Sequence, residues 1–153
     1  MTQTTHIAIL TPVAVGSIAV LCSILVHALG LGSAIQLFRF EKRRGRVGSE
    51  LWMDLGIIVS VMFLAFVAHL IEIALWARLF VLCGEFSEFQ TAFYHSAVNY
   101  TTLGYGDLIM SPAWRLLGPL EAADGALMFG LSTAMVFAVI LRMVQMKYED
   151  LRF

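Results

Sequence analysis

The sequence is poor in charged residues and in cysteine. Asp, Glu, Lys and Arg together make up only 14% of its 153 residues, whereas hydrophobic residues make up 59%, and the mean hydropathy is +0.83. This balance excludes an ordinary soluble domain and is typical of a protein with several membrane spans. Cys22 and Cys83 are most simply unpaired thiols and indicate no metal framework. The net charge of −1 provides no global basic surface, so we expect no nucleic-acid partner.

Three long apolar stretches predict three transmembrane helices, because each exceeds the roughly 20 residues that a bilayer crossing needs. These stretches run from about Ile7 to Phe38, from about Leu51 to Leu82 and from about Trp114 to Met143. Pro12 falls in the first turn expected for the first helix, where its missing amide hydrogen is tolerated. Trp52 and Trp76 are placed to anchor the second helix at the two membrane interfaces. The predicted fold class is therefore an all-α membrane protein.

A short apolar segment between the second and third stretches cannot cross a bilayer. It runs from Phe86 to Tyr100 and predicts a re-entrant helix, and the spacing of Ser87 and Gln90 is that of a capping box at its start. An amphipathic helix on the membrane surface is the alternative. We favour the re-entrant helix because it leads directly into the loop that follows.

That loop, residues 101–107, has the sequence Thr-Thr-Leu-Gly-Tyr-Gly-Asp. Gly104 and Gly106 can adopt left-handed backbone conformations at little steric cost, so successive carbonyls can point at one axis. The side chains of Leu103 and Tyr105 then turn away and pack into surrounding protein. Stacked carbonyl rings of this kind can replace the hydration shell of a potassium ion. The expected ion-coordinating residues are Thr102, Leu103, Gly104, Tyr105 and Gly106, with K+ as the permeant ion and no other cofactor.

This loop resembles the selectivity filter of the tetrameric potassium channels, Thr-x-Gly-Tyr-Gly-Asp. Residues 126–134 are similar to the pore-lining inner helix of bacterial members, and Gly125 matches the glycine that precedes that run. The resemblance covers about Phe86 to Met143 and takes the second stretch as the outer helix. It implies passive potassium conduction, and one pore loop per chain then requires a homotetramer. The inner-helix hinge and cavity residues that it implies are Gly125, Phe129, Gly130 and Thr133. Close helix packing is an equally good interpretation of the small residues among them.

The residues expected to support the filter are Tyr94, His95, Val98, Thr101 and Asp107. Tyr94 and His95 stand where many family members carry a Trp pair, and Val98 stands where some carry a Glu. A phenol at position 94 can donate a hydrogen bond to Asp107. His95 is either a proton-sensitive neighbour of the filter or, more simply, a neutral packed histidine with one hydrogen bond.

Two pairs of ionisable residues inside the predicted spans lie three positions apart. His69 and Glu72 share one face of the second helix, and Glu121 and Asp124 share one face of the third. Charges at that depth are paired or functional. We expect a polar network that joins the outer, inner and pore helices behind the filter. The rival is a metal site on His69 and Glu72, which offers too few ligands for zinc.

The basic residues predict the orientation in the membrane. Eight of them lie in the linker after the first helix or at the end of the chain, and they are Arg39, Lys42, Arg43, Arg44, Arg46, Arg142, Lys147 and Arg152. Arg78 and Arg115 flank the pore loop. The positive-inside rule therefore places the amino terminus and the filter outside the cell and the carboxyl terminus in the cytoplasm.

We divide the chain into residues 1–48, an extra transmembrane helix with its basic linker, and residues 49–153, a potassium-channel pore domain. The expected protein is a non-enzymatic, multi-pass channel of the cell membrane, with membrane lipids and copies of itself as partners. A weakly selective cation channel and a non-conducting channel-like subunit are the alternatives.

Overall fold

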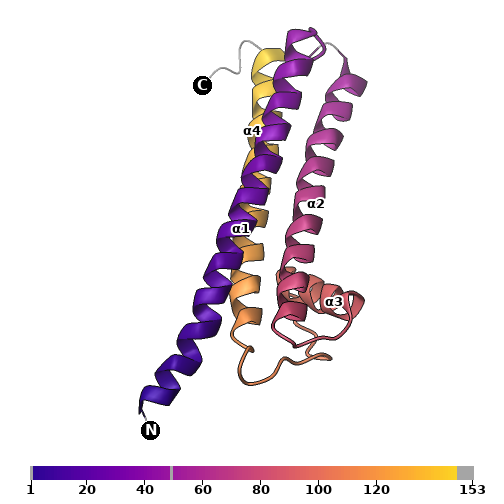
Figure 1. The fold of residues 1–153 in the computed structure, drawn as a ribbon. Coiled ribbons are helices and arrows are strands. Elements are labelled where there is room, and N and C mark those ends of the chain that lie inside the picture. Colours follow the sequence, from indigo (N-terminus) through magenta and orange to yellow (C-terminus); the bar gives the residue numbers. More distant parts are fainter. Residues whose placement is uncertain (1, 49, 148–153) are drawn as a thin grey trace. The chain divides into compact units, whose positions relative to one another are not determined.

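The computed structural model describes residues 2–48 and 50–147, with side chains from residue 9 onward. Over these ranges the chain forms helices and no strands (Figure 1). The helices are α1 (Thr2–Arg43), α2 (Leu51–Leu82), α3 (Phe89–Tyr100) and α4 (Leu117–Lys147). The helices α1, α2 and α4 contain segments that are long and apolar enough to cross a membrane. The predicted all-α membrane fold is therefore confirmed.

The helix boundaries follow the sequence closely for α2 and less closely elsewhere. α1 begins at Thr2, so Pro12 lies inside the helix and the prediction that it occupies the first turn is wrong. Residues 2–11 contain neither Gly nor Pro, and nothing in them ends the helix early. α4 begins at Leu117 and not at Trp114. This start leaves Pro119 in the first turn, where amide hydrogens have no partner within the helix.

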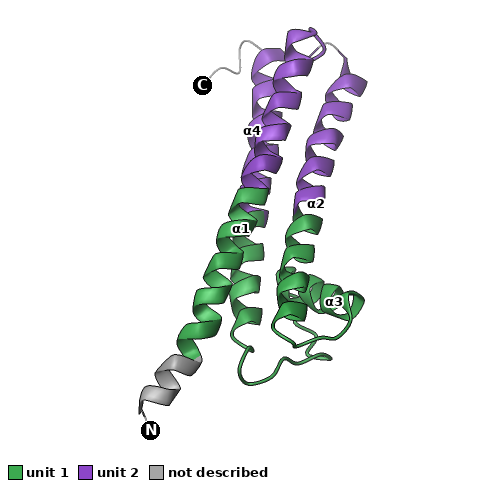
Figure 2. Cartoon of the chain, in the orientation of Figure 1, with its two compact units in different colours: residues 1–26, 69–128 green, residues 27–68, 129–153 purple. Residues whose placement is uncertain are grey.

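Two compact units make up the chain (Figure 2). Unit 1 contains the first part of α1, up to Val26, together with His69–Met128. Unit 2 contains His27–Ala68 and the chain from Phe129 onward. The predicted division after residue 48 falls in the linker between α1 and α2, and it stays a prediction.

The core of unit 1 joins parts of all four helices. The buried side chains of α2 include Trp76 and Phe80, both with no exposed surface, and they pack with Ala19 of α1 and Tyr100 of α3. α1 also approaches α4 closely, since a Cβ added at Gly16 would lie 2.6 Å from Cδ1 of Leu120. The first part of α1, up to Val26, is therefore an integral part of this unit.

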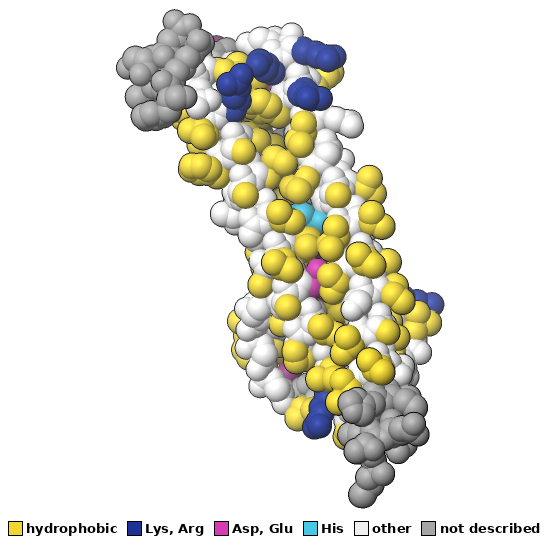
Figure 3. Space-filling model, turned by 90° about the vertical axis from the view of Figure 1, so that its left-hand side faces the viewer, with side chains coloured by type: hydrophobic (Ala, Val, Ile, Leu, Met, Phe, Trp, Pro, Cys, Tyr) yellow, Lys and Arg dark blue, Asp and Glu magenta, His cyan; other side chains and the backbone are white. Residues whose placement is uncertain are grey.

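Unit 2 has its own apolar core and carries most of the basic residues. Ala34, Ile57, Val61 and Val139 are among its buried side chains. The Oγ of Ser132 lies 3.2 Å from Nε2 of His27, so His27 is a packed, hydrogen-bonded histidine. Lys and Arg side chains gather at one end of this unit, over the end of α1 and the loop after it (Figure 3).

Candidate functional site

The short helix α3 delivers the chain to the loop at residues 101–107. It begins at Phe89, and Glu88 is the N-cap residue in extended conformation, with φ −114° and ψ 132° and no side-chain cap. The amide of Ala92 donates to the Glu88 carbonyl at 3.1 Å, which is the first bond of the helix. The predicted start at Phe86 with a Ser87 capping box is therefore wrong. The predicted end at Tyr100 agrees with the structure.

Every second residue of the loop has a left-handed backbone. The φ angles are +61° at Thr102, +58° at Gly104 and +71° at Gly106. The two glycines behave as their sequence spacing predicts. The left-handed conformation of Thr102 was not predicted, because a β-branched residue rarely adopts it. The left-handed conformation of Thr102 could have been predicted from the sequence by continuing the two-residue spacing of Gly106 and Gly104 one step further back.

Hydrogen bonds to the end of α3 hold the beginning of the loop. The amides of Leu103 and Gly104 donate to the carbonyl of Val98 at 3.0 and 3.3 Å. The hydroxyl of Thr101 donates to the Ala97 carbonyl at 2.7 Å. Val98 therefore holds the loop through its backbone carbonyl oxygen. A residue of any type at this position would supply the same acceptor.

Two side-chain contacts brace the loop further along. The phenol of Tyr94 donates to Oδ2 of Asp107 at 2.8 Å, the partner that the sequence predicted. This hydrogen bond, helped by the nearby negative charge, raises the pKa of Tyr94. The second contact was missed from the sequence. Glu85 accepts hydrogen bonds of 2.6 Å from both the amide and the hydroxyl of Ser111, and this ties the end of α2 to the segment after the filter loop.

His95 is packed among aromatic rings. Its ring centroid lies 5.5 Å from that of Phe80 and 4.9 Å from that of Phe86. Its Nε2 lies 2.9 Å from Nδ2 of Asn99, so the amide donates and the imidazole accepts. Burial lowers the pKa of His95, against the opposing effect of the Asp107 and Glu85 charges. These contacts favour the neutral, packed histidine over the proton sensor.

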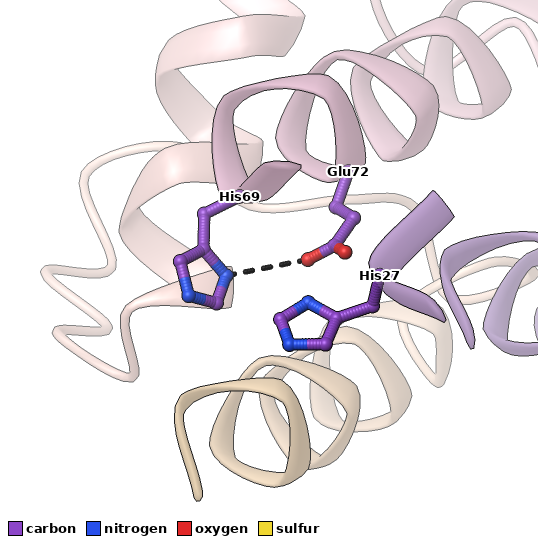
Figure 4. Close-up of side chains that lie close together, drawn as sticks. All are labelled: His27, His69 and Glu72. Carbon is purple, nitrogen blue, oxygen red and sulfur yellow. Dashed lines mark hydrogen bonds and ion pairs between the residues drawn. The ribbon is translucent and has the colours of Figure 1, made fainter. Parts of the chain in front are cut away.

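Two polar side chains of α2, Glu72 and His69, contact α3 at Tyr100. The phenol of Tyr100 donates to Oε2 of Glu72. Nδ1 of His69 lies 3.0 Å from the Tyr100 oxygen and 3.3 Å from the same carboxylate oxygen (Figure 4). Glu72 and Tyr100 have no exposed surface, and burial, together with the hydrogen bond to Glu72, raises the pKa of Tyr100. A tyrosine between two partners of α2 thus fixes the end of α3.

Two carboxylates of α4, those of Asp124 and Glu121, contact α2 and α3. Nε1 of Trp76 donates to Oδ2 of Asp124 at 2.9 Å, so Trp76 is a buried hydrogen-bond donor and its predicted role as an interface anchor is wrong. The hydroxyl of Ser96 contacts both Oε1 of Glu121 and the Ile73 carbonyl, the latter at 2.8 Å. A serine hydroxyl carries one proton, and a backbone carbonyl cannot donate. Ser96 therefore either shares its proton between the two oxygens or donates to the Ile73 carbonyl while a protonated Glu121 donates to Ser96.

Gly125 of α4 is tightly packed against the end of α3. A Cβ added at Gly125 would overlap the carbonyl oxygen of Tyr100 and lie 2.9 Å from its carbonyl carbon. Gly130 has nothing within 4 Å of the corresponding position. Phe129 is 37% exposed, and the hydroxyl of Thr133 donates to its carbonyl at 2.8 Å. Close packing thus explains Gly125, whereas the hinge and cavity roles stay predictions.

A family model described as "Ion channel" matches residues 58–142, more than half of the chain. The chain belongs to this ion channel family. The match spans most of α2, all of α3 and the loop at residues 101–107, and most of α4. Searches of curated proteins and of solved structures gave no match. With three candidate membrane helices, this membership makes the protein a multi-pass membrane protein of a class that moves ions.

Proposed function

We propose that the chain is one subunit of a homotetrameric, potassium-selective channel. The observation that carries the proposal is the alternation of positive φ angles at Thr102, Gly104 and Gly106 within a loop that ends in Gly-Tyr-Gly-Asp. A backbone that alternates in this way suits a column of carbonyl oxygens facing one axis. Such a column needs no side-chain charge, which fits the apolar residues at positions 103 and 105.

Conduction would be passive and would involve no covalent chemistry. Dehydrated K+ would be held by the carbonyls of residues 102–105 and by the Thr102 hydroxyl, with Gly106 at the outer end. Each entering ion would displace the next along the column. Asp107 would add negative charge at the mouth, on the side where Tyr94 holds it.

The composition of the loop surface supports a tetramer. Leu103 is 59% exposed and Tyr105 is 68% exposed in the single chain. Large apolar side chains beside a pore loop are expected to be covered, because exposed apolar patches of this kind mark contact surfaces. Each chain contributes one filter loop, and four copies would close the ring.

We also propose that the channel lies in the cell membrane with its amino terminus and filter outside. The basic end of unit 2 (Figure 3) supports this orientation under the positive-inside rule. Two of its side chains have local partners, since Arg46 pairs with Glu41 at 3.2 Å and Arg44 lies 4.1 Å from the Phe40 ring centroid. Because these two side chains already have partners within the chain, the basic cluster is better explained as a topology signal than as a dedicated ligand site.

Reversal potentials test the function. The purified protein is reconstituted in vesicles with opposed K+ and Na+ gradients, and the potential is expected to follow the K+ gradient. Gly104→Ala should abolish selective flux, because the new side chain would sit at φ +58°. The matched control is Gly56→Ala in α2, whose added Cβ meets nothing within 4 Å and whose φ is not positive. A potential that follows Na+, or flux unchanged by Gly104→Ala, would overturn the assignment.

A further inference from the structure

An apolar groove runs between α1 and α2 within unit 1. It is lined by side chains from residues 15–22 of α1 and 75–82 of α2 and has a volume of about 330 Å³. Ile18, Cys22, Leu75 and Leu82 are among its apolar residues, and Arg78 is the only charged residue in its lining. We call this feature the α1–α2 groove. Its volume falls at the lower end of the range for sites that hold small molecules.

Arg78 is a residue of α2 without a polar partner among the described residues. It is exposed, and within the part of the chain that the structure describes it makes no hydrogen bond or ion pair. It lies close to Leu82, where α2 ends, so its guanidinium can reach the headgroup level while its aliphatic stem lies along the apolar wall. A cation placed there attracts an anion from the membrane surface.

The surroundings of the groove point to a lipid as its occupant. Both walls belong to candidate membrane-spanning helices, so the solvent at most of the groove is hydrocarbon. An occupant must therefore be apolar along most of its length and anionic at one end. A phospholipid has this distribution of polarity, and the planar guanidinium pairs with phosphate through two parallel hydrogen bonds.

We propose that the α1–α2 groove binds a membrane phospholipid with an anionic headgroup, with one acyl chain along the apolar wall and its phosphate on Arg78. A zwitterionic headgroup carries its own cation, which competes with Arg78 for the phosphate, so net negative lipids are preferred. The proposal concerns binding alone and is independent of the ion that the channel selects.

Lipid retention tests the proposal directly. The full-length protein is placed in nanodiscs of phosphatidylcholine with a minor fraction of phosphatidylglycerol, then released and weighed by native mass spectrometry. We expect phosphatidylglycerol to be retained above its share of the bilayer, and Arg78→Gln to reduce this retention about fivefold to tenfold, as for loss of a charged contact near a membrane surface. Arg115→Gln is the matched control, because Arg115 also flanks the pore loop but does not line this groove.

Cys22 reports on the same site without changing its charge. In a Cys83→Ser background Cys22 is the single thiol of the chain, and its rate of labelling by a membrane-soluble maleimide measures how open the groove is. Phosphatidylglycerol should slow this labelling about fivefold relative to phosphatidylcholine alone, and Arg78→Gln should remove the difference.

Three results would each overturn the proposal. Equal retention of both lipids, with no effect of Arg78→Gln, would indicate ordinary surrounding lipid. Labelling of Cys22 that is independent of lipid would indicate an empty groove. Protection that disappears when the oligomer dissociates, at constant lipid, would indicate that a second copy of the chain fills it.

Discussion

The carbonyl of Tyr100 lies against Gly125 so closely that α4 has no room for a side chain at this position. The same tyrosine donates its phenol to Glu72 of α2. The last residue of α3 is therefore held between α2 and α4, immediately before the loop at residues 101–107.

Gly125→Ala should destabilise the protein. Replacing glycine by alanine inside a helix normally stabilises by about 0.5–1 kcal/mol, but here the methyl group would overlap the Tyr100 carbonyl. Overpacking of this kind costs about 1–3 kcal/mol, so the clash should win and the unfolding midpoint of the purified protein should fall. Gly130→Ala is the control, because its Cβ would meet nothing within 4 Å, and it should be neutral or mildly stabilising. Equal behaviour of the two variants would contradict the packing of Gly125.

Glu121→Gln should fold as well as the wild type. If Glu121 carries a proton, it donates to Ser96, and the amide of glutamine can donate to the same oxygen. Glu121→Leu should cost about 1–3 kcal/mol, because it leaves the polar environment of Ser96 without its donor. Thermal unfolding of the three proteins in one detergent measures both effects. A loss on Glu121→Gln as large as that on Glu121→Leu would show that the carboxylate is ionised.

Tyr94→Phe should impair the filter more than it impairs folding. The hydrogen bond to Asp107 lies at the surface, and Tyr94 is 44% exposed, so its loss should lower the stability of the fold only slightly. The outer end of the loop, however, loses one of its braces, and K+ over Na+ selectivity in reversal-potential measurements should fall. Phe93→Leu, on the adjacent position, serves as a control for changes in α3. Unaltered selectivity in Tyr94→Phe would remove this contact from the filter's support.

His95 should make stability depend on pH. Burial lowers its pKa in the folded protein, so below the unfolded value of about 6.5 the unfolded chain binds the proton more readily. The free energy of unfolding should therefore fall with falling pH, by at most about 1.4 kcal/mol per pH unit, until the folded pKa is passed. Above the unfolded value the contribution is constant.

Unfolding midpoints of the wild type and of His95→Gln, compared between about pH 8 and about pH 5, isolate this effect from the other histidines. As the pH falls, the unfolding midpoint of the wild type should decrease more than that of His95→Gln. Channel currents, in contrast, should respond to external pH identically in both proteins. A current response lost in His95→Gln would restore the proton-sensor hypothesis.

The sequence predicts the parts of this protein that depend on local chemistry. A long, mostly apolar run located α2 at Leu51–Leu82, and the glycine spacing anticipated the left-handed positions at Gly104 and Gly106. The ionisable residues at helical spacing indicated which faces of α2 and α4 are polar. In each case the property belongs to the residue and its immediate neighbours.

Other features depend on contacts between segments far apart in the chain. The sequence shows Trp76 as an aromatic residue near a helix end, and only its pairing with Asp124, 48 residues later, makes it a buried donor. Ser111 is an ordinary loop serine until Glu85 is brought beside it. The left-handed backbone of Thr102 goes against the preference of its residue type and is imposed by the loop on either side.

The polar contacts between α2, α3 and α4 can form only in the order in which these helices are synthesised. Glu72 leaves the ribosome 28 residues before the tyrosine that donates to it, and Trp76 leaves 48 residues before its acceptor Asp124. A carboxylate is costly in hydrocarbon, and before α3 and α4 are made Glu72 has only His69 of its own helix as a polar partner. The polar contacts of unit 1 are therefore complete only after both α3 and α4 have been synthesised.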